Sequence, residues 1–402
     1  MDATPATPLS GIRVLDLTNV LSGPFCCHQL AHFGAEVIKI EVPGRGDLAR
    51  QLGADPELNA ADMGVSFLAQ NAGKKSLTLN LKSPSGVDLL KRLTATADVV
   101  VENFRPGVMD RLGVGFDDLA PLNPRLVYCA ISGFGQDGPM RSMPAYDQIV
   151  QGLSGVMSVT GDAETAPLRV GYPVSDTIGG MTAAFAICAS LAGPREKPVF
   201  LDISMLEATL ATMGWVVSNW MIAGQRPAAH GNENTTSAPS GAFRARDAAL
   251  NIAANKDEQW RLLCEELERP DLLADPDYAT RETRKTNRHA LRAEIERSLA
   301  AGDAADWVAR LSRRGIPAGE ILTVPETLAH PQVAGRGMIA EFEEVPGVGR
   351  PIRTVRTGIK VNGTPPSVDT PPPVLGRDTV DILEELGITA EEIERLRQEG
   401  AI

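Results

Sequence analysis

The first part of the chain alternates short apolar runs with segments of helical spacing. Residues 11–17 (GIRVLDL) and 35–41 (AEVIKIE) have the composition of buried strands, and residues 25–33 between them carry apolar side chains at helical intervals. A strand, a helix and a second strand in so short a stretch predict a βαβ unit. The two strands of such a unit are parallel, and the crossover between them is right-handed.

The same alternation continues toward residue 132. Further strands are predicted at residues 75–81, 97–102 and 126–132, and a helix at residues 82–96. The run ADVVVE at 97–102 is of the continuously apolar kind found inside parallel sheets, which are covered on both faces. Several strands that alternate with helices predict an α/β fold with a doubly wound parallel sheet.

Three loops follow the predicted strands, at residues 19–23, 41–47 and 103–107. In doubly wound sheets, ligands bind beyond the carboxyl ends of the strands, so these loops are the first candidates for binding. Each could equally be a plain connection. The first turn, NVLSGP, lacks the G-x-G-x-x-G pattern, so the phosphate cradle of a dinucleotide-binding fold is missing.

The pattern changes in the second half of the chain. Residues 201–223 are predicted to form one long apolar helix, and a long polar loop follows at 225–241. Charged amphipathic helices are predicted at 257–267 and 286–314. The chain then becomes strand-rich before a last charged helix at 378–399. The middle section therefore predicts a smaller second domain.

Composition narrows the classes of function. A formal net charge of -12 argues against sequence-independent nucleic-acid binding, although a few Lys and Arg in one cleft can still hold an anion. The longest nearly uncharged run, residues 177–193, is short for a membrane span and favours a buried helix. Five cysteines form no C-x-x-C pair, which suggests reduced thiols. We expect a cytoplasmic protein that binds neither nucleic acid nor membrane.

Familiar catalytic motifs are absent from the sequence. His28 and His32 are four residues apart and could form half a metal site, but no third ligand is implied and packing is the simpler interpretation. No G-x-S-x-G elbow occurs. Cys26 and Cys27 lie near the first loop with no basic residue arranged around them, which favours buried, inert thiols. We expect no metal, and carboxylate chemistry remains.

Asp176 is the residue on which that chemistry would depend. It lies in residues 171–191, where a turn-prone segment passes into a helix of small and apolar residues. Aspartate at this position is typical of an N-cap, but it could instead present an ionised carboxylate to an acyl group. A free aspartate has a pKa of about 3.9 and is ionised at neutral pH. Its attack on an acyl thioester would give a mixed anhydride, which a thiolate can open without ATP or metal.

A series of motifs then points to a known family. In chain order they are PLSGIRVLDLTNVLSGP, FGAEVIKIEVPGRGD, KKSLTLNLKSPSG, ADVVVENFRPGVMDRLG, AISGFGQDGP, AYDQIVQGLSG, the Asp176 segment, ANKDEQW, GIPAGEI, HPQVAGRGM and PPPVLGRDT. Together they make the chain resemble the family III CoA-transferases (the CaiB/BaiF group), which include formyl-CoA transferase, carnitine CoA-transferases and α-methylacyl-CoA racemase. Each motif alone is weak, and their order along nearly the whole chain is specific.

The resemblance implies an architecture. Members form interlocked homodimers with a large Rossmann-like domain built from both termini and a smaller inserted domain. On this chain the implied segments are 1–224 for the large CoA-binding domain, 225–325 for the small domain, and 326–402 for the return to the large domain.

The resemblance also implies site residues. Asp176 aligns with the aspartate that attacks the acyl-CoA donor and then forms an aspartyl-CoA thioester, and Asp147 aligns with a second carboxylate nearby. Lys82 and Arg111 would pair with phosphates, although each alone could be a solvated surface charge. The residues that carry over as CoA contacts are Val20, Ser22, Leu79, Lys82, Asn103, Phe104, Arg111 and Tyr146.

Departures from formyl-CoA transferase bear on the substrate. Leu21 and Val42 stand where that enzyme carries Gln and Arg, and its run of glycines is absent from residues 229–241. Oxalate and formate are therefore not expected. The pattern looks closer to members that use succinyl-CoA as donor and a small dicarboxylate (glutarate, itaconate, citramalate, mesaconate) or a sulfinate as acceptor. Arg50, or else Arg169, is the candidate for binding the remote acid group.

Two other functions stay open at this point. A racemase of the same fold would need an acid–base pair at an α-carbon, and no histidine lies near the expected alignment. A non-catalytic acyl-CoA-binding protein would keep the fold without using the carboxylate of Asp176.

Overall fold

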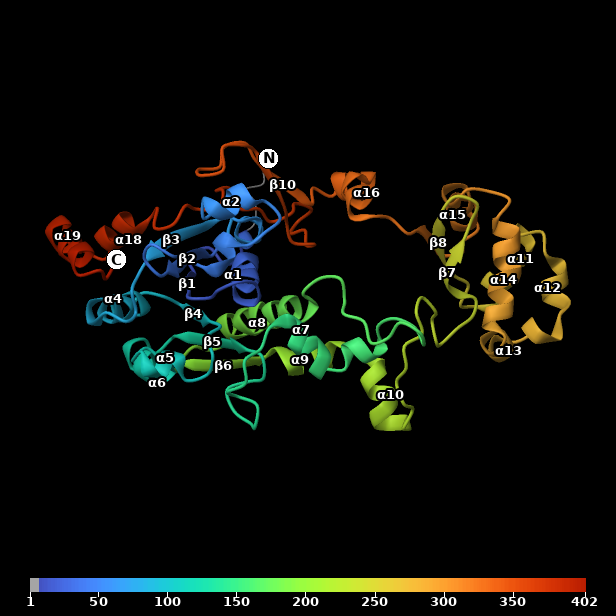
Figure 1. Ribbon diagram of the computed structural model, residues 1–402, viewed down its shortest axis with the longest axis horizontal. Helices are drawn as coiled ribbons and strands as arrows, with labels where there is room; N and C mark the ends of the chain where they lie inside the picture. Colours follow the sequence, from blue (N-terminus) through green and yellow to red (C-terminus); the bar gives the residue numbers. More distant parts are fainter. Residues whose placement is uncertain (1–6) are drawn as a thin grey trace. The chain divides into compact units, whose positions relative to one another are not determined.

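The computed structural model describes residues 7–402, which form two compact units (Figure 1). Unit 1 combines the chain up to Val156 with Arg169–Ile222 and Pro331–Ile402, and unit 2 combines Met157–Leu168 with Ala223–His330. Compared with the segments implied above, unit 2 also takes in Met157–Leu168.

Unit 1 is built on one six-stranded sheet in the order β3-β2-β1-β4-β5-β6. All five neighbouring pairs are parallel, which confirms the predicted α/β fold with a parallel sheet. The chain passes outward from β1 in both directions, so the order reverses between β1 and β4, where such sheets place their ligands. The strands are β1 Arg13–Asp16, β2 Glu36–Glu41, β3 Lys74–Thr78, β4 Val99–Glu102, β5 Val127–Ser132 and β6 Val199–Ser204.

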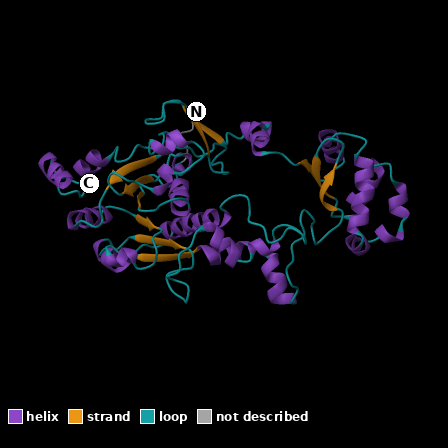
Figure 2. Ribbon diagram, in the orientation of Figure 1, coloured by secondary structure: helices purple, strands orange, loops and turns teal. Residues whose placement is uncertain are grey.

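Helices cover both faces of this sheet (Figure 2). The described helices of unit 1 are α1 Ser22–His32, α2 Pro56–Ala60, α3 Val65–Leu68, α4 Pro84–Thr94, α5 Val108–Arg111, α6 Phe116–Leu119, α7 Asp147–Leu153, α8 Val174–Ala192, α9 Met205–Thr212, α10 Trp215–Ala223 (whose last residue enters unit 2), α17 Pro331–Gly335, α18 Thr379–Glu385 and α19 Ala390–Gln398. A separate antiparallel ribbon pairs β10 Ile339–Phe342 with β11 Ile352–Val355.

The sequence prediction of one helix at 201–223 was wrong. The segment begins with β6, continues as α9, and resumes as α10 after Gly214, whose φ of +54° interrupts the helix. The alternating burial of β6 is typical of an edge strand. Its apolar residues continued without a break into α9, which hid the change of period.

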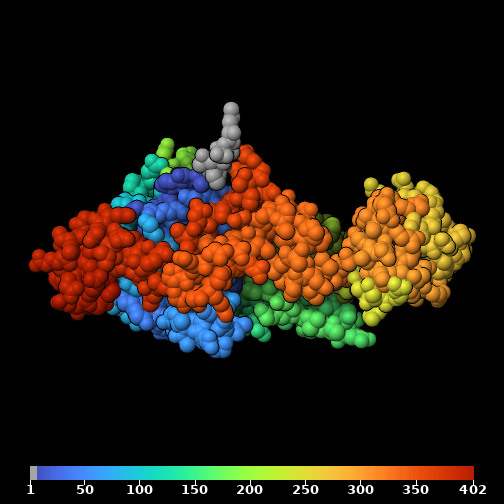
Figure 3. Space-filling view, turned by 90° about the horizontal axis from the view of Figure 1, so that it is seen from above, coloured from blue at the N-terminus to red at the C-terminus, as the bar shows by residue number. Residues whose placement is uncertain are grey.

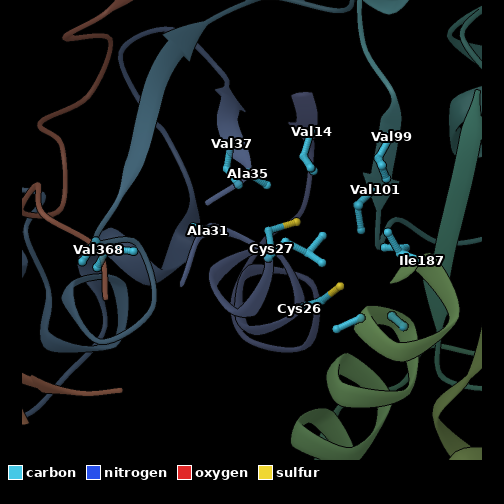
Figure 4. Close-up of a cluster of buried hydrophobic side chains, with 14 of the residues drawn as sticks. Val14, Cys26, Cys27, Ala31, Ala35, Val37, Val99, Val101, Ile187 and Val368 are labelled. Carbon is cyan, nitrogen blue, oxygen red and sulfur yellow. The ribbon is translucent and has the colours of Figure 1, made fainter. Parts of the chain in front are cut away.

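Side chains alternate between the two faces of each strand, and both faces are buried in the central strands. Val14, Val37 and Val99 point to α1 and α8, with Cys26 and Cys27 of α1 packed among them (Figure 4). Burial raises the pKa of the Cys27 thiol well above its ordinary value, which fits the interpretation of an inert core residue. On the other face, α4, α18 and α19 cover a second cluster that includes Leu15, Ile38, Val100 and Tyr128.

The C-terminal residues return to the N-terminal part of the sheet. The carbonyl of Thr370 accepts a hydrogen bond from the N–H of Gly73, and the carbonyl of Ala401 accepts one from the N–H of Asn80. Figure 3 shows the C-terminal residues, in red and orange, lying against N-terminal residues in blue. Segments from both ends of the chain therefore complete one unit.

Helix α8 has two different faces. It is the one described helix that is long and apolar enough, by length and composition, to cross a membrane, and 33% of its apolar window is buried. Gly180 and Ala183 pack inside the unit, whereas Met181 and Phe185 are exposed. The prediction of a buried helix therefore holds for one face of α8.

Unit 2 has its own core. Three antiparallel strands, in the order β7-β8-β9, pack with helices around Trp260, Leu263, Ile295 and Leu311. The predicted helix at 286–314 is in fact two helices, α14 and α15. The elements of unit 2 are β7 Ser240–Arg244, β8 Ala249–Ala253, α11 Asp257–Glu266, α12 Pro270–Ala274, α13 Arg281–Thr286, α14 Arg288–Leu299, α15 Ala304–Arg313, β9 Ala318–Glu320 and α16 Val324–Ala329.

Candidate active site

The start of α8 is capped by a carboxylate from another helix. Asp147, the first residue of α7, accepts hydrogen bonds through Oδ1 from the backbone N–H groups of Ser175 (2.8 Å) and Asp176 (3.3 Å). Pro173 occupies the N-cap position and supplies no side-chain bond. The interpretation of Asp176 as the N-cap is therefore wrong, because Asp147 satisfies these N–H groups instead.

A buried glutamine holds Asp147 in place. Gln151 donates from Nε2 to Asp147 Oδ2 at 2.6 Å, and its Oε1 accepts the backbone N–H of Val170 at 2.9 Å. The Arg169 guanidinium lies 3.9 Å from Asp147 Oδ2 and is largely exposed. Gln151 thus ties α7 to the segment that brings Arg169 beside the start of α8.

The carboxylate of Asp176 has no such support. Among residues 7–402 it has no hydrogen-bond or ion-pair partner. Burial raises its pKa to about 7, and the negative charge of Asp147 adds to the effect. The expectation that Asp176 is fully ionised at neutral pH is therefore corrected. Its carboxyl group titrates near neutral pH, and its ionised form is poorly solvated.

Close packing brings α8 to the end of the first loop of the sheet. Gly180 lies one turn after Asp176 on the same face of α8. A Cβ at Gly180 would come within 2.4 Å of the carbonyl oxygen of Ser22, so only glycine permits this approach of α8 to α1. The loop that precedes α1 consequently lies on the side of α8 that carries Asp176.

That loop is held in one shape by Asn103 and Asp47. Asn103 accepts the N–H of Asn19 and donates to its carbonyl, both at 2.8 Å, and approaches Ser22 Oγ at 3.4 Å. Val20 has a φ of +67°, which a β-branched residue rarely adopts, and its N–H donates to Asp47 Oδ1 at 2.9 Å. Strain of this kind is found mainly at functional sites.

Comparison with known proteins decides the family. The model of CoA-transferase family III matches residues 9–379. This chain belongs to CoA-transferase family III. Members of this family use CoA thioesters as substrates.

Similar proteins include several named CoA-transferases. The chain is 39% identical to acetyl-CoA:oxalate CoA-transferase of Acetobacter aceti over 87% of this chain and 90% of that protein. It is 35% identical to succinyl-CoA:glutarate CoA-transferase of Mus musculus over 96% and 88%. It is also 35% identical to succinyl-CoA:mesaconate CoA-transferase of Haloarcula marismortui over 94% and 96%.

Solved structures of the group have the same fold. A CaiB/BaiF family protein from Brucella suis superposes with a TM-score of 0.82 at 32% identity, covering 95% of this chain and all of that chain. A Mycobacterium tuberculosis protein gives a TM-score of 0.80 at 32% identity, over 94% and 99%.

The residues expected to contact CoA lie at the carboxyl ends of three parallel strands. Val20 and Ser22 follow β1, Leu79 and Lys82 follow β3, and Asn103 and Phe104 follow β4. Leu79 is buried, and its N–H donates to the carbonyl of Glu41. Lys82, Arg111 and Tyr146 are exposed, and Tyr146 directly precedes Asp147.

Arg50 does not fit the role of acceptor residue that the sequence suggested. Its side chain is fully buried and forms a two-bond ion pair with Glu41, at 2.7 and 2.8 Å. It also donates to the carbonyl of Pro373 and stacks over the ring of Phe67. In this conformation Arg50 supports the structure of the 41–50 loop and cannot reach a substrate, whereas Arg169 lies at the start of α8.

A buried ion network behind the loops went unrecognised in the sequence. Lys74 pairs with Asp16 at 2.8 Å, Lys39 pairs with Asp47 at 2.9 Å, and all four side chains are buried. Lys39 also donates to the carbonyl of Thr18. The available signal was the presence of Asp and Lys inside otherwise apolar strands, which is rare without a partner.

The two histidines four residues apart on α1 contact each other. His32 Nε2 and His28 Nε2 are 3.1 Å apart, and His28 Nδ1 lies 3.1 Å from the carbonyl of Ala72. Burial lowers the pKa of both rings. Within residues 7–402, no group of three or more His, Cys, Asp or Glu side chains is arranged to hold a metal ion.

Proposed function

We propose that this protein transfers CoA from an acyl-CoA donor, preferentially succinyl-CoA, to a small carboxylic, dicarboxylic or sulfinic acid, with Asp176 as the nucleophile. The observation that carries the proposal is the uncommitted, poorly solvated carboxylate of Asp176 beside a loop of the CoA-transferase family. Burial without a partner makes the ionised carboxylate a stronger nucleophile than one in water.

The reaction follows from that carboxylate. An oxygen of Asp176 attacks the thioester carbonyl, and CoA leaves as the thiolate, which gives a mixed anhydride. The thiolate then attacks the aspartyl carbonyl and releases the donor acid as its carboxylate. The acceptor carboxylate attacks the aspartyl-CoA thioester, and the freed thiolate attacks the acceptor's acyl carbonyl, which regenerates Asp176. Each step exchanges one acyl bond for another, so no ATP is consumed.

Asp147 has a specific part in this proposal. Its charge repels the ionised form of Asp176, and acylation of Asp176 removes that charge. The covalent intermediate therefore relieves both the repulsion and the poor solvation, which lowers the free energy of the intermediate relative to the free enzyme. The backbone N–H groups at the start of α8, which could have stabilised an oxyanion, are occupied by Asp147.

We infer that CoA lies along the carboxyl ends of β1, β3 and β4, in unit 1 as the large CoA-binding domain, with unit 2 as the smaller inserted domain. Lys82 and Arg111 are exposed cations that suit phosphates. Phe104 and Tyr146 offer flat apolar contact, and Val20, Ser22, Leu79 and Asn103 shape the path.

Arg169 is the proposed residue for the remote acid group of the acceptor. It is the exposed guanidinium beside Asp147, and an arginine can bind a carboxylate through two parallel hydrogen bonds. The named relatives act on glutarate and mesaconate, and one acts on oxalate. The departures from formyl-CoA transferase led to the expectation that oxalate is not a substrate, and this expectation is therefore withdrawn. Oxalate is added to the candidate acceptors.

We also propose a cytoplasmic homodimer, interlocked as in the family. Support comes from exposed apolar side chains on α8, α9 and α10 that a single chain leaves in water, because grouped apolar side chains on a surface often mark a protein interface. A second copy would cover this apolar surface. Sedimentation should give a dimer of 42.8 kDa chains. The exposed residues of this apolar surface include Met181, Phe185, Trp215, Trp220, Met221 and Ile222.

The test is a panel of acids offered with succinyl-CoA, with products read by mass. Transfer to at least one acid is expected, and Asp176→Asn should abolish it while acyl-CoA binding persists. Asp277→Asn, a change in unit 2, is the matched control. Persistent turnover in Asp176→Asn would reject the nucleophile. Proton exchange at the α-carbon in deuterated water, without transfer, would indicate the racemase instead, and binding without either would indicate a sensor.

A further inference from the structure

A cavity of about 280 Å³ lies on the opposite face of the sheet from α8, beside β4, β5 and β6. Helices α5 and α6 form its other side. Its wall includes Glu102, Asp110 and Asp117, three acidic residues that the reaction proposed above does not use. The volume is near the lower end of the range for small-molecule sites, so it suits a ligand smaller than a typical drug.

The strand register places two carboxylates on the face of the sheet that carries the cavity. Glu102 of β4 pairs with Ala130 of β5, which pairs in turn with Asp202 of β6. Residues paired in register point to the same face of the sheet. The two carboxylates are therefore separated by about 10 Å of sheet at two strand spacings. Of these three residues, Glu102 is the one that lines the cavity.

Aromatic rings close the space on the next row of the sheet. Tyr128 stacks on Phe200 with ring centroids 5.7 Å apart, and Phe116 of α6 contacts both rings at 5.9 and 5.2 Å. All three residues line the cavity. A wall of rings combined with carboxylates attracts cations, because ring faces and carboxylates both carry negative potential.

Two largely buried residues in the wall have polar atoms that open onto the cavity and have no partner in the described chain. Tyr128 is 2% exposed, and its hydroxyl makes no hydrogen bond to any residue in 7–402. Glu102 is 5% exposed, and Oε2 accepts the N–H of Phe104 at 2.7 Å, while Oε1 is left without a described partner. No Lys or Arg of the described chain forms an ion pair with Glu102. A ligand in the cavity can therefore bond to both groups without displacing a protein partner.

We propose that this cavity is a second ligand site, which binds a small organic ammonium ion between Glu102 and the rings of Phe116, Tyr128 and Phe200. The cation neutralises Glu102, and its alkyl groups lie on the ring faces. An anionic ligand would be repelled by the acidic wall. A metal ion fits less well, because the described acids and histidines nowhere form a set of three suited to a metal.

The ionisation of Glu102 gives the site a distinctive signature. Burial, and then the charges of Asp110 and Asp202, raises the pKa of Glu102 to about 8. The charged or titratable groups facing it are Asp110 on α5, Asp117 on α6, Tyr128 on β5, Asp202 on β6 and Arg141 in the loop after β5. Since only the ionised form pairs with the ligand, affinity should rise about tenfold from pH 7 to pH 9.

The experiment is calorimetric titration of the full-length protein with choline, and with its neutral isostere 3,3-dimethylbutan-1-ol at the same ionic strength. One choline per chain is expected, bound at least tenfold more tightly than the alcohol. At pH 7, binding should release close to one proton, which is measured by comparing buffers of different ionisation enthalpy. Equal affinity for choline and the alcohol, or no choline binding at pH 9, would overturn the proposal.

Variants separate this site from general effects. Glu102→Gln keeps an oxygen for the Phe104 N–H and removes the charge, so choline binding should weaken at least tenfold. Asp137→Asn, on the neighbouring loop, is the matched control and should bind as the natural chain does. Equal binding by Glu102→Gln contradicts the proposal. So does choline binding that appears only in Arg141→Ala, because Arg141 would then be the native occupant.

Discussion

Two aspartates in unit 1, the buried Asp16 and the half-buried Asp176, have opposite surroundings. Asp16, at the end of β1, lies between Lys74, with which it pairs at 2.8 Å, and the nearby Lys39. Although burial raises its pKa, the two lysines lower the pKa of Asp16 well below its ordinary value. Asp176, at the start of α8, has no cation at hydrogen-bond distance, and its pKa is raised to about 7.

The comparison shows that burial alone does not define a reactive carboxylate. Asp16 is fully buried, yet its charge is neutralised by fixed lysines, so it stabilises the loop and has no tendency to form a bond. Asp176 is less buried, but its neighbour is another carboxylate, so its charge costs free energy that a covalent bond removes. The partner determines whether a buried acid is structural or chemical.

The largest effect is expected from Asp176→Asn on transfer. The amide cannot form the anhydride, so kcat/KM should fall by about 10³-fold or more, while the affinity for acyl-CoA changes little. Steady-state transfer assays and equilibrium binding of a non-transferable CoA thioester measure the two quantities. Retention of transfer within tenfold of the natural protein would contradict this role.

Next in size is the loss of the partner of Asp16. Lys74→Met leaves a buried carboxylate without its nearest cation, which should lower the free energy of unfolding by about 3–5 kcal/mol. Denaturant unfolding measures this change. Lys75→Met is the matched control, because Lys75 pairs with Glu36 at a partly exposed site and should cost less than about 1 kcal/mol. Equal losses for the two variants would mean that burial of the pair has no special effect.

Asp176→Asn should have the opposite effect on stability, and one that depends on pH. A carboxyl whose pKa is raised from 3.8 to about 7 on folding destabilises the folded state above its unfolded pKa. The natural protein should therefore lose stability as the pH rises from about 4 through 7, relative to the variant. The variant should be more stable by about 2–4 kcal/mol at pH 8 and equal at pH 4. Parallel stability curves would rule out the raised pKa.

The smallest effect concerns the acceptor. Arg169→Gln removes one charge-assisted interaction, so the KM of a dicarboxylate acceptor should rise about tenfold, whereas a monocarboxylate acceptor should be affected less than about twofold. Arg169→Lys, which keeps the charge, should lie between the two. The KM values of glutarate and butyrate provide the comparison. An equal rise for both acids would assign Arg169 to the positioning of Asp147.

Much of the sheet could be predicted from the sequence, because apolar runs of strand length recur between helical segments. Strand β6 could not, since its apolar residues lead directly into α9. Asp176 could be proposed as a nucleophile from its place at the start of a helix. The residues that surround its carboxylate could not be predicted. Asp147 caps α8 through a hydrogen bond to a residue 29 positions later in the sequence. Gln151 holds Asp147 in place through hydrogen bonds that no sequence pattern reveals.

Arg50 also shows that side-chain contacts could not be predicted from the sequence. Its position near the 41–47 loop suggested a substrate contact, but the side chain turns inward to Glu41, nine residues earlier. Local sequence indicates which residues lie near the carboxyl ends of the strands. It does not indicate which of them point to the ligand, because that depends on partners brought in by the fold, such as the carbonyl of Pro373.

The most direct test of the central claim is the mass of the intact protein after brief incubation with succinyl-CoA and no acceptor. An increase equal to CoA less one water is expected. The increase should be lost on treatment with hydroxylamine and map to the peptide that contains Asp176. An unmodified protein that nonetheless catalyses transfer, or an adduct on any other residue, would contradict the account.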